Sequence, residues 1–213
     1  MQKRLDVYLS ENNTVKSRSL AASLIKQGSV EVNGRICTKA SFAVDENDNI
    51  RIIGEMPKYV GRGGLKLEKA LSHYRLHLDG SVCIDIGAST GGFTDCMLQN
   101  GAVKVYSVDV GTDQLDEKLR NDPRVVSMEK TDIRNCVGSL PAVDFIGIDV
   151  SFISLKLVLP SAYALLKDGG ECVALIKPQF EAGKSHLSKH GIVRDSKAVS
   201  YTHLRAHETS LHL

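Results

Sequence analysis

The sequence lacks tryptophan, and aromatic residues make up only 5% of its 213 residues. Aromatic stacking platforms for single-stranded nucleic acid are therefore not the expected design. No stretch approaches the roughly 18 consecutive apolar residues of a membrane helix, and the first six residues lack the apolar core of a secretory signal. We expect a cytoplasmic protein without a membrane partner.

Paired cysteines are also missing. The five cysteines are odd in number and none belongs to a CxxC motif, which argues against a disulfide framework or a structural zinc site. His203 and His207 are four residues apart and would share one face of a helix. This isolated pair is weak evidence, and we expect no metal. Free cysteines within apolar runs suit a reducing compartment.

Charge is divided unevenly along the chain. Residues 1–66 hold 11 Lys and Arg against 7 Asp and Glu, a net +4, whereas residues 67–213 hold 16 against 18, a net −2. A small basic segment before a larger, nearly neutral one indicates a polyanion-binding module joined to a second domain. An ordinary solvated surface explains the charge alone equally well.

The first segment has the pattern of two short helices and a small sheet. Leu5 and Leu9 mark the first helix, and Ser17 is placed to cap a second helix that runs to Lys26. The dipeptide Asn33-Gly34 between alternating residues predicts a tight hairpin. Residues 50–53 are expected to form a further strand before a linker.

From residue 64 onward, predicted strands alternate with predicted helices. This alternation is typical of a parallel sheet covered by helices on both faces, an α/β fold. The expected strands are 82–86, 103–108, 125–128, 143–149 and 171–176, and the expected helices are 67–74, 92–100, 114–120 and 155–166.

A glycine-rich loop follows the strand 82–86 and begins the next helix, where open α/β sheets bind ligands. Asp109 ends the next strand and can accept both ribose hydroxyls of an adenosine, and Asp132 can reach the adenine amino group. The loop does not match G-x-G-x-x-G, which disfavours a dinucleotide and favours S-adenosylmethionine. Alternatively, the acids only cap helices and the glycines only turn the chain. The candidate cofactor-binding residues are Asp85, Gly87, Ala88, Ser89, Gly91, Gly92, Phe93, Asp109 and Asp132.

Three charged residues are expected to meet beside this loop. Lys66 begins a helix, Asp149 ends the fourth strand and Lys177 ends the fifth. Methyl transfer to a hydroxyl requires its deprotonation, which a lysine of lowered pKa can perform while a second lysine and an aspartate orient the hydroxyl. Any one lysine alone would be an ordinary surface residue.

The chain resembles the TlyA (haemolysin A-like) family over residues 3 to about 199. These are ribosomal RNA methyltransferases with an S4 RNA-binding domain and an FtsJ-like, Rossmann-type catalytic domain. The motifs that carry the resemblance are Arg4-Leu5-Asp6, Ser17-Arg18, Gly28-Ser29-Val30-Glu31-Val32-Asn33-Gly34, Gly61-Arg62-Gly63-Gly64-Leu65-Lys66-Leu67, Asp85-Ile86-Gly87-Ala88-Ser89-Thr90-Gly91-Gly92-Phe93-Thr94, Arg120-Asn121-Asp122-Pro123-Arg124-Val125, Asp149-Val150-Ser151-Phe152-Ile153-Ser154-Leu155 and Lys177-Pro178-Gln179-Phe180-Glu181.

The resemblance implies a Lys-Asp-Lys-Glu catalytic tetrad. Lys66, Asp149 and Lys177 match its first three members, with Lys177 as the base, whereas nothing in residues 200–213 matches the glutamate. We therefore expect a class I methyltransferase domain without its last strands. The expected division is an S4-like domain at 1–57, a linker at 58–63, the incomplete FtsJ-like domain at 64–199 and a foreign or disordered tail at 200–213.

The resemblance also implies S-adenosylmethionine as methyl donor and cytidine 2′-hydroxyls of 16S and 23S-type ribosomal RNA, free or in ribosomal subunits, as targets. The candidate RNA-binding residues are Arg4, Lys16, Arg18, Lys26 and Arg62. Two alternatives stay open, a non-catalytic RNA-binding protein or inactive fragment, and a nicotinamide-dependent oxidoreductase. Pore formation is not expected. The oligomeric state is left open.

Overall fold

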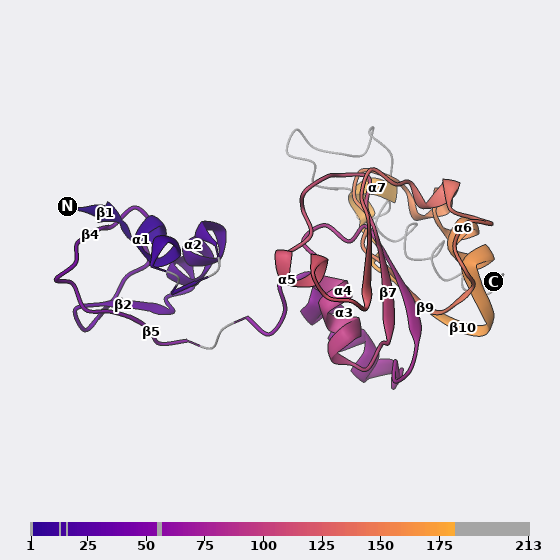
Figure 1. The fold of residues 1–213 in the computed structure, drawn as a ribbon, viewed down its shortest axis with the longest axis horizontal. Helices are drawn as coiled ribbons and strands as arrows, with labels where there is room; N and C mark the ends of the chain where they lie inside the picture. The colour runs from indigo at the N-terminus through magenta and orange to yellow at the C-terminus, as the bar shows by residue number, and fades with distance from the viewer. Residues whose placement is uncertain (1, 13, 16, 55–56, 182–213) are drawn as a thin grey trace. The chain divides into compact units, whose positions relative to one another are not determined.

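The computed structural model describes residues 2–12, 14–15, 17–54 and 57–181. The chain divides between residues 57 and 58 into two compact units (Figure 1). Among the described residues, no helix is both long enough and apolar enough to cross a membrane. The segment 182–213, which includes the predicted tail and its histidine pair, lies outside the described residues.

The described residues of the first unit form two helices and two small sheets. The sheets are antiparallel, one with the order β3-β2-β5 and one formed by β1 and β4. The elements are β1 (Lys3–Arg4), α1 (Leu5–Glu11), α2 (Arg18–Lys26), β2 (Val30–Val32), β3 (Arg35–Ile36), β4 (Ala43–Val44) and β5 (Ile50–Ile52).

Local sequence explains these elements. The Ser17 hydroxyl accepts a hydrogen bond from the backbone N–H of Leu20 at 3.2 Å, which caps α2 as predicted. Asn33 and Gly34 both have positive φ, 52° and 79°, and form the predicted hairpin turn. Strands β1 and β4 were not predicted, because two residues are too few to show an alternating pattern.

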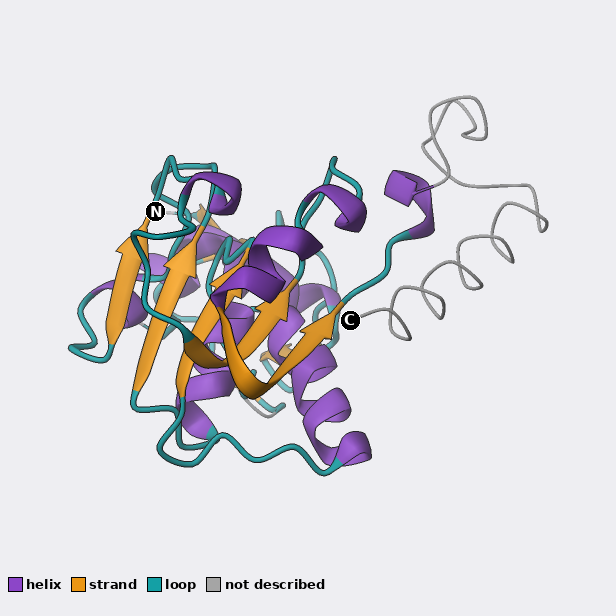
Figure 2. Cartoon of the chain, turned by 90° about the vertical axis from the view of Figure 1, so that its right-hand side faces the viewer, coloured by secondary structure: helices purple, strands orange, loops and turns teal. Residues whose placement is uncertain are grey.

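Over its described residues, 58–181, the second unit is a five-stranded parallel sheet with helices on both faces, as predicted (Figure 2). The strand order is β10-β9-β6-β7-β8, so the chain winds outward from β6 in both directions. The elements are α3 (Gly63–Tyr74), β6 (Val82–Ile86), α4 (Gly92–Gln99), β7 (Lys104–Val108), α5 (Glu117–Arg120), β8 (Val125–Met128), η1 (Ile133–Asn135), β9 (Val143–Ile148), η2 (Leu155–Leu157), α6 (Leu159–Leu165), β10 (Leu166–Ala174) and α7 (Pro178–Glu181).

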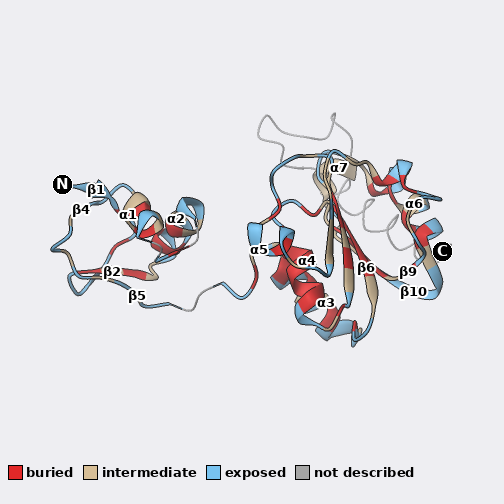
Figure 3. Cartoon of the chain, viewed as in Figure 1, coloured by how far each residue is buried: buried red, intermediate tan, exposed pale blue. Residues whose placement is uncertain are grey.

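Neighbouring residues of β6 face different cores. Cys83 packs into one apolar cluster with residues of α3, α4 and α5, whereas Ile84 packs into another with residues of η1, η2 and α6. Both clusters are buried, and they flank the sheet in Figure 3. The rigid sheet therefore fixes the positions of its strand ends, where the candidate site lies.

Four elements differ from the sequence predictions by more than one residue. The helix expected at 67–74 begins earlier, at Gly63, and the helix expected at 114–120 begins later, at Glu117, where the carboxylate of Asp116 accepts from the backbone N–H of Lys118 and caps it. The expected helix 155–166 is two separate pieces, η2 and α6, because Pro160 lacks a backbone N–H and suits the first turn of a new helix. The expected strand 171–176 is the longer β10, and its pairing with β9 shifts register between Leu166 and Glu171.

Candidate active site

The loop after β6 passes close to the end of β9. The backbone N–H groups of Gly87 and Ala88 donate to the carbonyl oxygen of Val108, at 2.9 and 3.2 Å. Gly87 has a φ of +85°, and a Cβ there would lie 2.9 Å from the carbonyl oxygen of Asp149. Because β6 and β9 flank the point where the strand order reverses, this loop lies where open α/β sheets bind ligands.

Asp109, at the end of β7, is tied to the same loop. Its Oδ2 accepts from the backbone N–H of Ser89 and its Oδ1 accepts from that of Gly111, both at 2.7 Å. A carboxylate oxygen has two lone pairs, so each oxygen can accept one further hydrogen bond. The residue therefore suits the ribose hydroxyls of an adenosine.

Asp85, within β6, is fully buried. Its Oδ2 accepts from the backbone N–H and the hydroxyl of Thr94, at 2.9 and 2.7 Å, whereas its Oδ1 has no hydrogen-bond partner within the described residues. Burial penalises the charged form and raises the pKa of Asp85 to about 7. An unpartnered buried oxygen beside a glycine loop fits a ligand that brings a donor.

The three predicted catalytic residues lie together. Lys177 Nζ is 2.6 Å from Asp149 Oδ1, and Lys66 Nζ is 3.8 Å from Asp149 Oδ2. Lys177 also donates to the hydroxyl of Ser151 at 2.9 Å. One carboxylate thus lies between two ammonium groups that come from α3 and from the end of β10. About a fifth of the Asp149 and Lys177 side chains is exposed, so both are open to a substrate.

A glycine-rich turn brings Lys66 to this place. A Cβ on Gly61 would lie 2.6 Å from the hydroxyl oxygen of Thr90, and a Cβ on Gly64 would overlap the ring of the buried Tyr59. The close packing of this turn against the loop 87–91 requires residues without side chains. Sequence reasoning quoted the glycines as a motif but missed the contribution of Tyr59.

Several predicted cofactor residues have other partners in the structure. The Asp132 carboxylate binds the guanidinium of Arg134, with an Oδ2–Nη2 distance of 2.6 Å, and caps η1. Phe93 is 3% exposed and packs in the core near Gly147. The remaining loop residues Ala88, Gly91 and Gly92 are buried and form the turn into α4.

The predicted RNA-binding residues of the first unit include an arginine pair. Arg4 donates from Nε and Nη2 to the two carboxylate oxygens of Asp6, both at 2.9 Å, and Arg18 Nε donates to Asp6 Oδ2 at 3.0 Å. These guanidiniums hold the pKa of the Asp6 carboxyl far below its usual range. Lys26 is exposed in the last turn of α2, and Lys16 lies outside the described residues.

In the second unit, the predicted RNA-binding residue Arg62 is exposed where α3 begins. An exposed aromatic residue that follows Asp149 and Ser151 in the chain was not predicted from the sequence. Phe152 follows Ser151, is 91% exposed and has a φ of +66°. Its ring packs on that of Phe180, with centroids 5.2 Å apart. A left-handed phenylalanine cannot be recognised from sequence.

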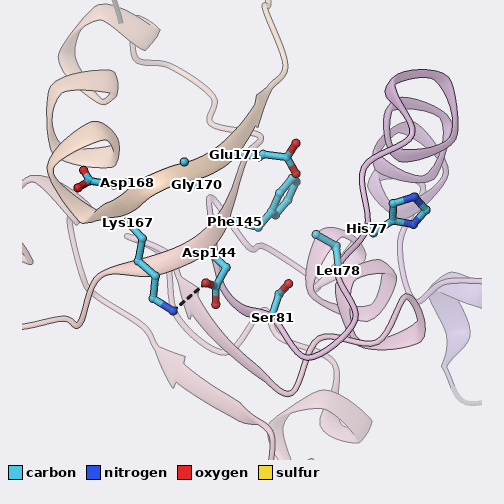
Figure 4. A pocket seen from close by; sticks show the side chains of 10 residues that line it. His77, Leu78, Ser81, Asp144, Phe145, Lys167, Asp168, Gly170 and Glu171 are labelled. Atoms are coloured by element: carbon cyan, nitrogen blue, oxygen red, sulfur yellow. Dashed lines mark hydrogen bonds and ion pairs between the residues drawn. The ribbon is translucent and has the colours of Figure 1, made fainter.

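A separate depression lies beside the first residues of β9 and β10, at the opposite end of these strands from Asp149 and Lys177 (Figure 4). An ion pair crosses one side of it, with Lys167 Nζ 2.7 Å from Asp144 Oδ1 at the start of β9. Its lining residues are His77, Leu78, Ser81, Asp144, Phe145, Lys167, Asp168, Gly169, Gly170 and Glu171. None of them is a predicted site residue, so this depression is distinct from the candidate active site.

Comparisons with known proteins decide the family. The sequence pattern of the FtsJ-like methyltransferases matches residues 59–212, and that of the S4 domain matches residues 3–50. The chain belongs to the FtsJ-like methyltransferase family. Its FtsJ-like unit carries the Lys66–Asp149–Lys177 cluster, and its S4 domain carries the Arg4–Asp6–Arg18 cluster.

Relatives of this FtsJ-like methyltransferase cover most of the chain. It is 47% identical to the "Putative rRNA methyltransferase YqxC" of Bacillus subtilis, over 92% of this chain and 71% of that protein. It is 38% identical to the 16S/23S rRNA (cytidine-2′-O)-methyltransferase TlyA of Mycobacterium tuberculosis, over 98% of this chain and 81% of that protein. Among solved structures, a "Putative hemolysin from Streptococcus thermophilus" is 45% identical, with a TM-score of 0.72, over 96% of this chain and 76% of that one.

Proposed function

We propose that this protein transfers a methyl group from S-adenosylmethionine to a ribose 2′-hydroxyl, that of a cytidine in 16S and 23S-type ribosomal RNA. The observation that carries the proposal is the Asp149 carboxylate between Lys66 and Lys177, next to the glycine loop at the strand-order reversal. An enzyme of ribosomal RNA works where ribosomes are, so we expect it in the cytoplasm.

The residues around the glycine loop suit the methyl donor. Asp109 keeps lone pairs for two ribose hydroxyls, and the buried Oδ1 of Asp85 lacks a donor. A Cβ at Gly87 would contact the Asp149 carbonyl, so the loop and the catalytic strand end are in direct contact. When bound here, S-adenosylmethionine supplies an electrophilic methyl group on a sulfonium and needs no phosphate site.

The lysine cluster suits the acceptor hydroxyl. In this proposal Lys177 Nζ would accept the proton of the 2′-hydroxyl as the hydroxyl oxygen forms a bond to the donor's methyl carbon and the bond between that carbon and the sulfonium sulfur breaks. Asp149 and Ser151 fix the direction of that amine through their 2.6 and 2.9 Å contacts. Lys66 is half exposed and adds a positive charge that stabilises the developing alkoxide.

RNA binding is assigned to two surfaces in this proposal. The Arg4–Asp6–Arg18 cluster presents guanidinium N–H groups that its internal bonds leave free, and these suit phosphate oxygens. Phe152 offers an exposed ring. It directly follows Ser151, whose hydroxyl accepts a hydrogen bond from Lys177. An unstacked base can pack on such a ring and hold its ribose near Lys177.

The test is methyl transfer by the purified chain from radiolabelled S-adenosylmethionine to ribosomal subunits and to naked ribosomal RNA. We expect labelled 2′-O-methylcytidine with the wild-type chain and at least about a 100-fold loss with Lys177→Ala. Lys167→Ala removes another ion-paired lysine of the same unit and is the matched control, with expected wild-type activity.

A parallel calorimetric titration with S-adenosylmethionine separates binding from chemistry. We expect Asp109→Ala to abolish this binding, because it removes both carboxylate acceptors at the end of β7. RNA binding by a folded wild-type chain without methyl transfer would contradict the proposal and leave a non-catalytic RNA-binding protein. Full methylation by Lys177→Ala would refute the base assignment.

A further inference from the structure

Two loops carry the Lys177–Asp149 pair, and they are unequally supported. Asp149 follows β9, which is hydrogen-bonded on one side to β6 and on the other to β10. Lys177 follows β10, whose one neighbouring strand among the described residues is β9. Within the part of the chain that the structure describes, the lysine therefore lies on the loop with less backbone support.

The backbone pairing of β10 ends before the lysine. The last hydrogen bond to the neighbouring strand runs from the backbone N–H of Leu175 to the carbonyl oxygen of Ile148, at 2.9 Å. Beyond it, the N–H of Phe180 donates to the carbonyl of Lys177 at 2.9 Å, which closes a turn within the loop itself. The position of this turn must be fixed by side chains.

Glu181 provides such a connection across the two loops. Its Oε2 accepts from the hydroxyl of Ser154 at 2.6 Å, and its Oε1 accepts from the backbone N–H of Leu155 at 2.8 Å. Both carboxylate oxygens thus bind the start of η2, at the far end of the loop that begins with Asp149. The packing of Phe180 on Phe152 adds an apolar contact between the same loops.

We propose that Glu181 is a positioning residue for Lys177. By fastening the loop after β10 to the loop after β9, its carboxylate holds the lysine amine against Asp149. The carboxylate of Glu181 binds Ser154 and Leu155 rather than Lys177, so its effect passes through the turn that joins the two residues. The inference rests on the proposed function, in which Lys177 takes the hydroxyl proton.

The kinetic test compares Glu181→Ala, Glu181→Gln and the wild-type chain. A misplacement of a catalytic group by about 1 Å can cost about 100-fold in rate. We expect kcat of Glu181→Ala to fall by about that factor, with KM for RNA and the affinity for S-adenosylmethionine nearly unchanged. Glu181→Gln keeps one acceptor oxygen and should be intermediate. Asp168→Ala, which removes an exposed carboxylate from β10, is the matched control.

A second readout does not depend on activity. Lysine acetylation at limiting reagent, followed by mass spectrometry, measures how freely each amine reacts. Lys177 is 22% exposed and held against Asp149, so restricted access of the reagent should keep its labelling slow in the wild-type chain. In Glu181→Ala we expect its labelling to rise several-fold, whereas labelling of Lys66 and Lys167 should stay the same.

The two readouts separate the two proposals. Absence of methyl transfer by the wild-type chain overturns the proposed function, and lysine labelling then still decides whether Glu181 holds Lys177. If Lys177 in Glu181→Ala is labelled at the same rate as in the wild-type chain, the positioning role is overturned, even if activity and melting temperature fall together. Faster labelling of Lys177 in Glu181→Ala with an unchanged kcat would show that positioning by Glu181 does not matter for the reaction, and would overturn the proposal.

Discussion

The carbonyl oxygen of Asp149 lies in the space that a side chain at position 87 would need. A Cβ at residue 87 would lie 2.9 Å from that oxygen, and the φ of +85° disfavours any L side chain. The glycine loop proposed to bind the methyl donor therefore contacts the backbone of Asp149, the residue that carries the proposed catalytic carboxylate. A side chain added at this contact must displace one of the two loops.

We expect Gly87→Ala to separate these two loops. The substitution should weaken binding of S-adenosylmethionine by at least about tenfold and destabilise the second unit by about 1–3 kcal/mol, through strain at a left-handed position. Calorimetric titration and urea unfolding measure the two effects. Gly138→Ala also places alanine at a positive φ, but nothing lies within 4 Å of its Cβ. It is the control for strain alone and should bind the donor normally.

Asp85 should make stability depend on pH. Its pKa is about 7 in the folded protein against an ordinary 3.8, because burial disfavours the charged form. Between these values the folded state holds a proton that the unfolded state releases, so the free energy of unfolding falls as pH rises. Asp85→Asn cannot ionise. It should exceed the wild-type chain in stability above pH 7, by up to about 4 kcal/mol, and lose this advantage toward pH 4.

Urea unfolding of the second unit at pH 4.5, 6 and 8 measures this difference. Asp168→Asn changes an exposed carboxylate of the same unit and should track the wild-type chain at each pH. A stability difference between Asp85→Asn and wild type that stays constant with pH would show that Asp85 is ionised throughout.

Asp6 should stabilise the S4 domain with the opposite dependence on pH. Hydrogen bonds from Arg4 and then Arg18 lower the pKa of this carboxyl, which is 3% exposed. Its contribution is therefore complete above pH 4 and is lost as pH falls through the lowered pKa. Asp6→Asn should destabilise the domain by about 2 kcal/mol at pH 7. The difference from wild type, followed by circular dichroism on melting, should shrink in acid.

Removing the side chain of Phe152 should raise the stability of the second unit and lower the affinity of the protein for RNA. Its φ of +66° is strained for a phenylalanine, and its ring is 91% exposed. Phe152→Gly should therefore stabilise the second unit by about 1 kcal/mol. If a base packs on the ring, the same variant should lose about 1–3 kcal/mol of RNA affinity, seen as a raised KM. Phe152→Leu retains the strain without the ring, so it should lose affinity and gain no stability.

The sheet and the lysine cluster were predictable because strand ends and charges are local features. The strand 82–86 was predicted with the bounds that the structure has, and Lys66, Asp149 and Lys177 do meet. Sequence alone did not reveal that Asp132 is bound by Arg134 or that Phe93 faces the core. Both depend on side-chain directions set by packing across the sheet, which a motif does not contain.

A second feature that the sequence did not reveal is the backbone conformation of one residue. A positive φ can be inferred at Gly34 within Asn33-Gly34, because that dipeptide is typical of one turn type. It cannot be inferred at Phe152, because phenylalanine normally avoids this region of backbone conformation. The low aromatic content pointed away from stacking, whereas the proposal above needs a single exposed ring, that of Phe152.

The strand order also dictates a sequence of events during synthesis. Strand β6 pairs with β7, which follows soon after it, and with β9, which begins only at Val143. As the chain leaves the ribosome, β6, β7 and β8 can assemble first, while the other edge of β6 stays open until β9 emerges. Because that later pairing is also what brings Asp149 beside Gly87, the nascent protein should acquire its catalytic centre only after β6, β7 and β8 have assembled.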